Sequence, residues 1–556
     1  MAATFDSEIR AKELRSILLG HLSKLTDDYI RRCSALDACS SFDAAALQFS
    51  KIIPDIIADL PLAIYGKDNP IPKYISYVRM FTGEYYEKVS LILIQDVIYQ
   101  DWLFDHCKLN PKYYKKLRDE SNYGIIKALR FRILKPSLMV MCFKNGVVDL
   151  RDVGIKRTDE LLNPFSPDYH CVKQYDFKWN PKAECPLWRG FLGMPAYVGQ
   201  PIADIDGVLP EASKRAVLQK FLGSGFIDRS RVKFEYMLIL YGTGANGKSV
   251  IKEVLDGIFG ADEVYPNLNL LDMAKDDDHG MRARKAVEGF RFSYCTELSP
   301  RALSRPETVK VFASGEGMSG RALGENISII SEIPLFMCNS NYDWSNYNLI
   351  PKDSPDDESM ARRVLLLNFD KKIEESRRDS ELVEKLLKEK EGIFMWIVRG
   401  YKRLRKSKWK IHDSLLGRID KVRMAANHPV LVNGNEVHGS IIEYIRFKNI
   451  SPIYDEDHTH DLLMSSTELH ENYVKFCEKN GIANIQTRAK LSRDFETMGY
   501  SKKVAFGANR RNGFIVYWSE PHPVLIFNNS VPSIEKILDV DSLLGEQYEE
   551  EEFIND

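Results

Sequence analysis

Residues Gly242–Ser249, Gly-Thr-Gly-Ala-Asn-Gly-Lys-Ser, restrict the fold of this chain more than any other segment. They fit the pattern G-x-x-x-x-G-K-[ST] at every fixed position. An apolar run, Tyr236–Tyr241, precedes the loop, and apolar residues at helical spacing follow it: Val250, Ile251, Val254, Leu255 and Ile258. This order predicts a buried strand, a glycine loop and a helix, as in a phosphate-binding α/β domain.

Such a loop binds phosphate mainly through its backbone. Glycines let successive N–H groups turn toward the phosphates, and the following helix adds its positive dipole end. Lys248 would reach the β- and γ-phosphates, and the Ser249 hydroxyl would bind Mg²⁺. By chance, about one or two chains in a hundred of this length would carry such a match. We therefore expect ATP and Mg²⁺ to bind at Gly242, Gly244, Asn246, Gly247, Lys248 and Ser249.

The composition is that of a soluble protein of several domains. The 556 residues are 44% hydrophobic and 28% charged, and the net charge is −2, which excludes a uniformly basic nucleic-acid coat. Nine scattered cysteines without a C-x-x-C pair argue against a zinc ribbon or a disulfide framework. With no signal region and no long apolar run, we expect an intracellular location, in host cytoplasm or nucleus if the source is viral, and no membrane partner.

Changes in pattern along the chain predict three or four folded domains within an overall α/β fold class. The predicted segments are a helical region over 1–90, a mixed domain over 91–230 with a hairpin at Lys135–Leu150, the ATPase core over 231–372, a helical connection over 373–435 that includes the basic run Lys402–Lys410, a winged-helix-like domain over 436–525, and an acidic tail over 526–556. We find no internal repeat.

Three further positions are candidates for catalysis. Glu297 ends the apolar run that we predict as the strand beside the phosphate loop, where a carboxylate can orient Mg²⁺ and water. Asn339 ends a second apolar run and could sense the γ-phosphate, although such an Asn is more often a turn residue. Arg363 precedes the strand Val364–Phe369 and could reach a neighbouring subunit's phosphates, or simply pair with acids just upstream.

The order of these motifs closely resembles the superfamily 3 helicases, in particular the primase-helicases of poxviruses, other large DNA viruses and phages. The resemblance also covers Phe143–Leu150 and Gln219–Gly223 before the ATPase and residues 440–520 after it. It implies an AAA+ P-loop ATPase core that forms rings, commonly hexamers, and moves 3′→5′ along single-stranded nucleic acid. It also implies catalytic roles for Lys248, Glu297, Asn339 and Arg363, with Ser249 and Glu297 at the metal.

Two features depart from that pattern. Many members have two adjacent acids at the strand end, whereas Thr296 precedes Glu297 here. The segment Arg321–Ser331 matches the hairpin that members point into the channel, but its tip lacks the usual Lys or His and contains Glu325. Because phosphate contacts need cations or N–H donors, our candidate DNA-binding residues are Lys310, Arg321 and Asn326, with Arg510 and Arg511 in the C-terminal unit.

The C-terminal unit is predicted to contain two helices, Leu469–Gly481 and Thr487–Gly499, and then two strands. Such a domain could bind DNA or, about as often, another protein. Asp457–Asp461 and Asp204–Asp206 are interpreted as loops, so no metal, nicking or primase site is predicted there. A separate primase or polymerase is therefore a possible partner.

We expect a homo-oligomeric, ring-forming DNA helicase for the replication of a virus, phage or mobile element, acting on single-stranded DNA in its channel and duplex at a fork. One alternative is an ATP-dependent origin-binding or assembly protein without processive unwinding. Another is a small-molecule kinase, which would be monomeric and insensitive to DNA. DNA-stimulated hydrolysis and strand release distinguish these three classes.

Overall fold

A computed structural model describes residues 2–25, 27–68, 75–105, 108, 114–194, 207–229, 231–298, 306–330, 332–341, 361–412, 429–432, 435–448, 450–451, 460–479, 482, 484–500, 502–506 and 511–518. Arg510, residues 457–459, Asp204–Asp206 and the acidic tail lie outside these residues, whereas His460 and Asp461, which we interpreted as part of a loop, begin the strand His460–Ser465. The chain divides into two compact units, Met1–Pro181 and Lys182–Asp556. Within the described residues, no helix has the length and apolar character required to cross a bilayer.

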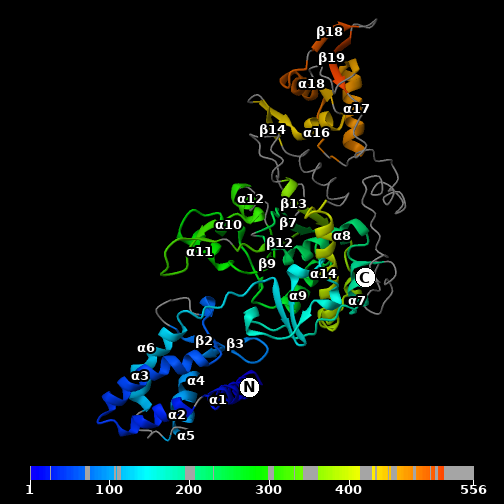
Figure 1. Cartoon of the computed structure of the whole chain (residues 1–556). Helices are drawn as coiled ribbons and strands as arrows, with labels where there is room; N and C mark the ends of the chain where they lie inside the picture. Colours follow the sequence, from blue (N-terminus) through cyan, green and yellow to red (C-terminus); the bar gives the residue numbers. More distant parts are fainter. Residues whose placement is uncertain are drawn as a thin grey trace. The chain divides into compact units, whose positions relative to one another are not determined.

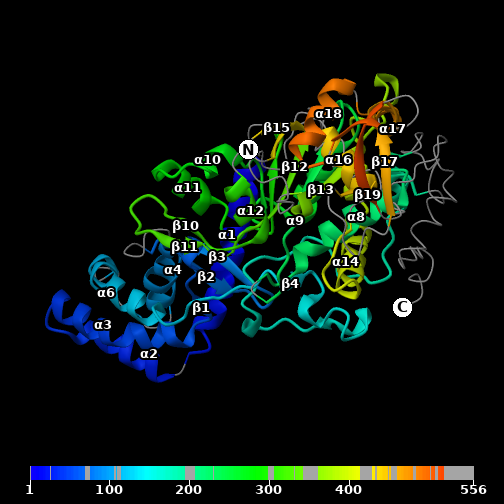
Figure 2. The ribbon, with the colours of Figure 1, turned by 90° about the horizontal axis from the view of Figure 1, so that it is seen from above.

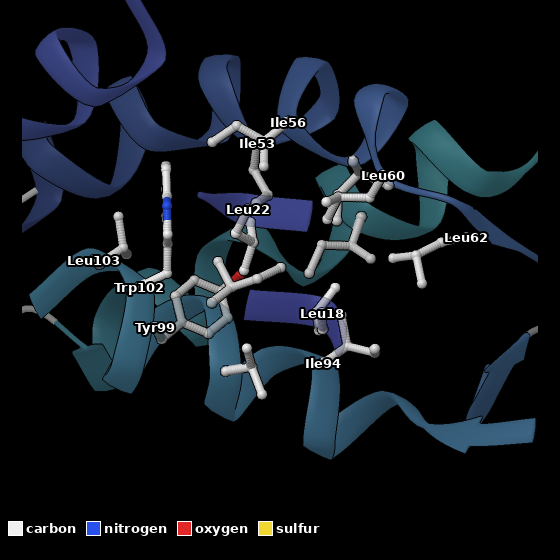
Figure 3. Close-up of a cluster of buried hydrophobic side chains, with 14 of the residues drawn as sticks. Leu18, Leu22, Ile53, Ile56, Leu60, Leu62, Ile94, Tyr99, Trp102 and Leu103 are labelled. Carbon is white, nitrogen blue, oxygen red and sulfur yellow. The ribbon is translucent and has the colours of Figure 1, made fainter. Parts of the chain in front are cut away.

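The first unit begins with helices around an apolar core (Figures 1 and 3). The helices are α1 Ala2–Leu22, α2 Asp27–Ser34, α3 Phe42–Asp59, α4 Leu91–Asp96, the π-helical turn Val97–Trp102, α5 Leu103–Asp105 and α6 Tyr114–Leu129. Buried side chains from Leu14 to Leu129 form one cluster, so the expected boundary at residue 90 lies inside a shared core. Burying one large apolar side chain there contributes about 1.5–3 kcal/mol.

Two small antiparallel sheets complete this unit. One has the order β1 (Leu62–Ala63), β2 (Tyr77–Phe81) and β3 (Tyr86–Ser90), which corrects our prediction that residues 1–90 are wholly helical. Along β2 burial alternates, as expected for a strand with one face in a core. The other sheet contains β4 (Val140–Phe143), β5 (Gly146–Asp149) and β6 (Leu162–Asn163). Phe143 pairs with Gly146, so the predicted hairpin is confirmed.

The second unit is built on a five-stranded parallel sheet of order β13-β7-β12-β9-β8. The strands are β7 Met237–Tyr241, β8 Val264–Tyr265, β9 Phe292–Cys295, β12 Leu335–Ser340 and β13 Val364–Asn368. Every residue of β7 and β12 is buried, as expected for a parallel sheet covered on both faces. The mixed α/β fold expected of a nucleotide-binding core is therefore present.

Helices cover the two faces of this sheet (Figures 1 and 2). On one side lie α8 (Ala212–Gly223) and α14 (Lys390–Lys406), which pack against each other. On the other lie α10 (Leu270–Met273), α11 (Asp278–Ala286) and α12 (Pro306–Ser314). The remaining helices are α7 (Pro186–Leu192), α9 (Lys248–Phe259) and α13 (Leu382–Leu387).

Residues 182–226 belong to this unit rather than to a separate preceding domain, so the expected boundary at 230 lies within it. The buried ammonium of Lys214 in α8 donates to Asn368 O at the end of β13, at 3.0 Å. Glu389, just before α14, accepts hydrogen bonds from Leu187 N and Trp188 N in the first turn of α7, both at 3.1 Å. α7, α8 and α14 therefore form part of the packed unit around the sheet.

The C-terminal residues contain both predicted helices, as α17 (Ser466–Lys479) and α18 (Arg488–Thr497), and the two strands that follow them, β18 (Lys502–Phe506) and β19 (Arg511–Trp518). Additional elements are β14 Pro429–Val432, β15 Asn435–His438, α16 Gly439–Lys448, β16 Ile450–Ser451 and β17 His460–Ser465. β16, β17 and β18 each pair with β19. The helices pack on one another through a core of their own that includes Tyr444, Tyr473 and Phe495.

Candidate active site

The phosphate loop joins the end of β7 to the start of α9 and is tightly curled. Gly242, Gly244, Ala245 and Gly247 all have positive φ, at 154°, 94°, 52° and 85°. A Cβ on Gly242 would lie 2.3 Å from Phe369 O, and one on Gly247 would lie 2.8 Å from Val208 Cγ1. These two positions therefore require glycine for both conformation and space. The predicted strand, loop and helix are confirmed, with Lys248 as the first residue of the helix.

Lys248 is folded back onto its own loop. Its ammonium donates to Gly242 O and to Asn246 Oδ1, both at 2.9 Å, and the residue is 4% exposed. Burial lowers the pKa of Lys248 to about 8, so the side chain is mostly protonated at neutral pH. No carboxylate among the described residues forms an ion pair with it. A buried cation of this kind is suited to an anionic ligand, whereas the neighbouring Ser249 is exposed.

Asn246 plays a structural part that its place in the motif did not reveal. Its side chain is buried, and Nδ2 donates to Phe369 O at 2.8 Å while Oδ1 accepts from Lys248. Ala245 O also accepts from Ile373 N at 2.8 Å. The loop is thus fastened to the segment that follows β13. The Asn246 side chain therefore links the Lys248 ammonium to the Phe369 carbonyl.

We expect Asn246→Ala to weaken ATP binding about five- to thirtyfold, because it removes two buried hydrogen bonds of about 1 kcal/mol each. Titration with a fluorescent ATP analogue measures the change. Asn326→Ala, at an exposed position in the β10–β11 hairpin (Met318–Gly320 and Ser328–Ile330), is the matched control. Equal affinity for the two variants would show that Asn246 does not organise the loop.

Glu297 and Asn339 lie at the same edge of the sheet as the phosphate loop. Asn339 in β12 pairs with Leu240 in β7, while Cys338 pairs with Cys295 in β9. β12 therefore separates the loop strand from β9, and our prediction that Glu297 ends the strand beside the loop is wrong. Of the two strands that flank β7, β12 carries Asn339, and Glu297 follows β9, one strand further away.

The surroundings of these two side chains differ. Asn339 is 6% exposed, and its Oδ1 is buried without a hydrogen-bond partner among the described residues. Glu297 is exposed, two residues beyond the end of β9. A buried unsatisfied oxygen is costly, typically by about 1–3 kcal/mol, and marks a position where a ligand or water would be bound. The edge thus combines a buried cation, an unsatisfied amide and an exposed carboxylate.

Arg362 and Arg363 lie at the opposite edge of the sheet. They belong to the 3₁₀ turn Ala361–Arg363 directly before β13, whose first residue pairs with Met237 at the start of β7. Five strand residues span about 16 Å. An arginine side chain at this end cannot reach the phosphate loop of its own chain.

The two arginines have different environments. Arg363 is 8% exposed and donates to Glu235 Oε1 at 3.0 Å, whereas the Arg362 side chain is 63% exposed and 3.9 Å from Glu235 Oε2. Burial alone would raise the pKa of Glu235, but hydrogen bonds from Lys233 and Arg363 outweigh it, and the pKa is lowered. Glu235 therefore remains ionised and holds Arg363 within its own subunit.

The β10–β11 hairpin corresponds to the segment Arg321–Ser331 that the family resemblance matches to a channel hairpin. Its first strand begins three residues before Arg321. Arg321 forms an ion pair with Asp278 of α11, so it is a hairpin anchor rather than an isolated cation. Lys310 is partly buried in α12, while Asn326 is exposed. The hairpin also exposes apolar side chains that the sequence pattern did not single out: Leu323 at 81%, Ile327 at 59% and Ile329 at 67%.

A buried arginine that the motifs did not predict also anchors the hairpin. Arg284 of α11 donates to Ser319 O in β10 at 2.8 Å, to Met273 O at 2.6 Å and to Lys275 O at 2.9 Å. Backbone carbonyls are its partners, and these have no side-chain signature in a sequence. The hairpin is therefore fixed to α10 and α11 at its base, while its tip is exposed.

Among the C-terminal candidates, Arg511 is the first residue of β19. Two of the basic residues on α18 have partners within the domain: Arg488 donates to Thr467 Oγ1 at 3.1 Å, and Lys490 lies 2.8 Å from Asp494 Oδ1. Arg493 is exposed.

Comparison with known proteins identifies one family over part of the chain. Residues 116–194 match the family described as D5 N terminal like. The match covers α6, the β4-β5-β6 sheet and α7, so it crosses the boundary between the two units. It includes Phe143–Leu150, on which the resemblance to viral primase-helicases partly rested. A search of curated proteins finds no match.

Solved structures of the NrS-1 C-terminal region are also similar. One apo structure (305–718) has a TM-score of 0.32 and 12% identity, covering 61% of this chain and 79% of that one. An A-form apo structure has a TM-score of 0.35 and 11% identity, covering 84% and 98%. A second A-form structure (305–718) has a TM-score of 0.32 and 11% identity, covering 79% and 93%.

Proposed function

We propose that this chain is the ATP-driven helicase subunit of a viral or phage-type replication system, with an AAA+ ATPase core of superfamily 3. The observation that carries the proposal is the carboxyl edge of the sheet, where the Lys248 loop, Asn339 and Glu297 lie on three adjacent parallel strands. The D5 N terminal like match at residues 116–194 supports the same family.

The residues at this edge are suited to a nucleoside triphosphate with a metal ion. The loop offers backbone N–H groups and the buried Lys248 ammonium, and the Asn339 amide would contact the terminal phosphate. The Ser249 hydroxyl and the Glu297 carboxylate would hold Mg²⁺, which neutralises charge on the phosphates. Because Thr296 replaces a second acid, Glu297 must also orient the attacking water.

The opposite edge supports assembly into a ring. Arg362 and Arg363 are about 16 Å from their own loop, so any contact with phosphate must come from a neighbouring subunit. A homo-hexamer that shares its ATP sites between subunits provides that arrangement. In such a ring the β10–β11 hairpin would line the channel and grip one DNA strand, with 3′→5′ movement as the family resemblance implies.

An unwinding assay tests this function. The purified chain should release the labelled strand of a forked DNA duplex with ATP and Mg²⁺, and single-stranded DNA should stimulate its ATPase. ATP hydrolysis and duplex binding without strand release would instead support an origin-binding or assembly protein. A monomer whose hydrolysis ignores DNA would support a small-molecule kinase.

A further inference from the structure

Arg229 binds four backbone carbonyls from three chain segments around the base of the β10–β11 hairpin. Its Nη1 donates to Ile333 O at 2.8 Å and Pro334 O at 3.2 Å, and its Nη2 donates to Ala313 O at 2.8 Å and Phe234 O at 3.3 Å. Ala313 precedes the hairpin and Ile333 follows it. One guanidinium group therefore holds both ends of the hairpin segment.

The partners of this guanidinium are unusual for a cation. No carboxylate among the described residues forms an ion pair with Arg229, and its Nε is buried without an acceptor. Burial lowers the pKa of Arg229 to about 10, so the group stays charged at neutral pH. Desolvating a charge without a counterion is costly, and the carbonyl groups must offset that cost. Such an arrangement keeps the three segments in a fixed geometry.

Gly315 lies directly against the Arg229 guanidinium. A Cβ at this position would lie 2.5 Å from Arg229 Nη2 and 2.6 Å from Cζ, and the residue has φ of +70°. The chain therefore turns toward the hairpin directly against the guanidinium. Any side chain at residue 315 would displace either the turn or Arg229.

Three of these four carbonyls, those of Phe234, Ile333 and Pro334, lie just before the strands that carry the candidate active site. Phe234 leads into β7, which ends at the phosphate loop, and Pro334 leads into β12, which contains Asn339. A shift of β12 relative to β7 at the nucleotide edge would change the spacing of these acceptors. Because the Arg229 guanidinium also bonds to Ala313 and Ile333 on the two sides of the hairpin, such a shift would move the base of the hairpin.

We propose that Arg229 is a positioning residue that fixes the β10–β11 hairpin to the starts of β7 and β12 and so couples the nucleotide edge to the hairpin. The coupling rests on the proposed function. The anchoring itself is a property of the fold. Arg229 touches neither nucleotide nor DNA in this role.

Two variants disturb the cluster in different ways. Arg229→Lys keeps the charge and removes the planar fork that matches four acceptors, and Gly315→Ala pushes on the guanidinium from the other side. Gly83→Ala is the matched control, because Gly83 also has positive φ, at 103°, and a Cβ added there would have nothing within 4 Å. It introduces similar backbone strain far from the cluster in sequence.

Amide hydrogen exchange and ATPase rates are then compared. We expect exchange across residues 311–335 to accelerate about tenfold in both cluster variants and not in Gly83→Ala. Stimulation of the ATPase by single-stranded DNA should fall at least about fivefold, with the basal rate changed less than about twofold. Unchanged exchange, or an equal loss of basal and stimulated rates, would overturn the proposal.

The two proposals can fail separately. Absence of ATP hydrolysis by the unaltered chain would overturn the proposed function. The exchange comparison needs neither nucleotide nor DNA, so it decides the anchoring role in either case. Arg229→Lys could show normal hydrolysis, normal unwinding and unchanged exchange. That result would support the proposed function and would exclude a positioning role for Arg229.

Discussion

Lys248→Ala should reduce ATP hydrolysis at least about a hundredfold, because it removes the only side-chain cation that the described structure places within the phosphate loop. Steady-state phosphate release measures the loss. Lys252→Ala is the matched control, since Lys252 lies one turn further along α9 and is engaged by Asp256. Equal rates for the two variants would show that the loop is not the catalytic phosphate site.

A second variant at this position, Lys248→Met, distinguishes loss of chemistry from loss of fold. The folded-state pKa of Lys248 is about 8, below the usual lysine value of 10.5, so folding disfavours the charged form. The corresponding cost is fully present below pH 8 and disappears above about pH 10.5. Thermal unfolding at pH 7 should therefore show no fall in Tm for Lys248→Met, whose apolar stem retains the packing.

Arg362→Ala should lower the ATPase rate by about 10³-fold or more while ATP affinity and Tm stay close to those of the unaltered chain. Its side chain is exposed at the edge that would face a neighbouring subunit. Arg363→Ala should also lose turnover, as the sequence predicts, but with a lower Tm because it removes the buried arginine from the ion pair with Glu235. Full turnover by Arg362→Ala would show that Arg362 does not contact phosphate and would favour Arg363 for that role.

Mixing variants tests whether the ATP site is shared. A subunit with Arg362→Ala still has an intact loop, and one with Lys248→Ala still has both arginines. Mixed rings should therefore recover part of the ATPase activity that each variant lacks alone. Zero recovery at every ratio would exclude a site formed between neighbouring subunits.

Local patterns in the sequence predicted the phosphate loop and its flanks almost to the residue. The glycines at 242 and 247 are demanded by backbone geometry, and the apolar run and helix on either side follow simple periodicity. The Phe143–Gly146 hairpin was predictable for the same reason. Such features depend on neighbours in the chain.

Features that depend on distant partners were not predictable. The sheet order places β12 between β7 and β9. The sequences of the strands do not specify that β7 pairs with β12 rather than with β9. Arg321 pairs with Asp278, 43 positions earlier, so its charge alone suggested a DNA contact instead. Arg229 and Arg284 bind backbone carbonyls, which are present at every residue and leave no pattern to read.

The contact between Gly247 and Val208 limits how the second unit can be shortened without disturbing the loop. Val208 N donates to Phe191 O at 2.9 Å, and the Val208 side chain rests against the phosphate loop from behind. A recombinant fragment truncated to start at the apolar strand would lose this contact, together with the hydrogen bond from Lys214 to Asn368. A fragment that keeps the surroundings of the loop therefore starts near Lys182 and retains α14.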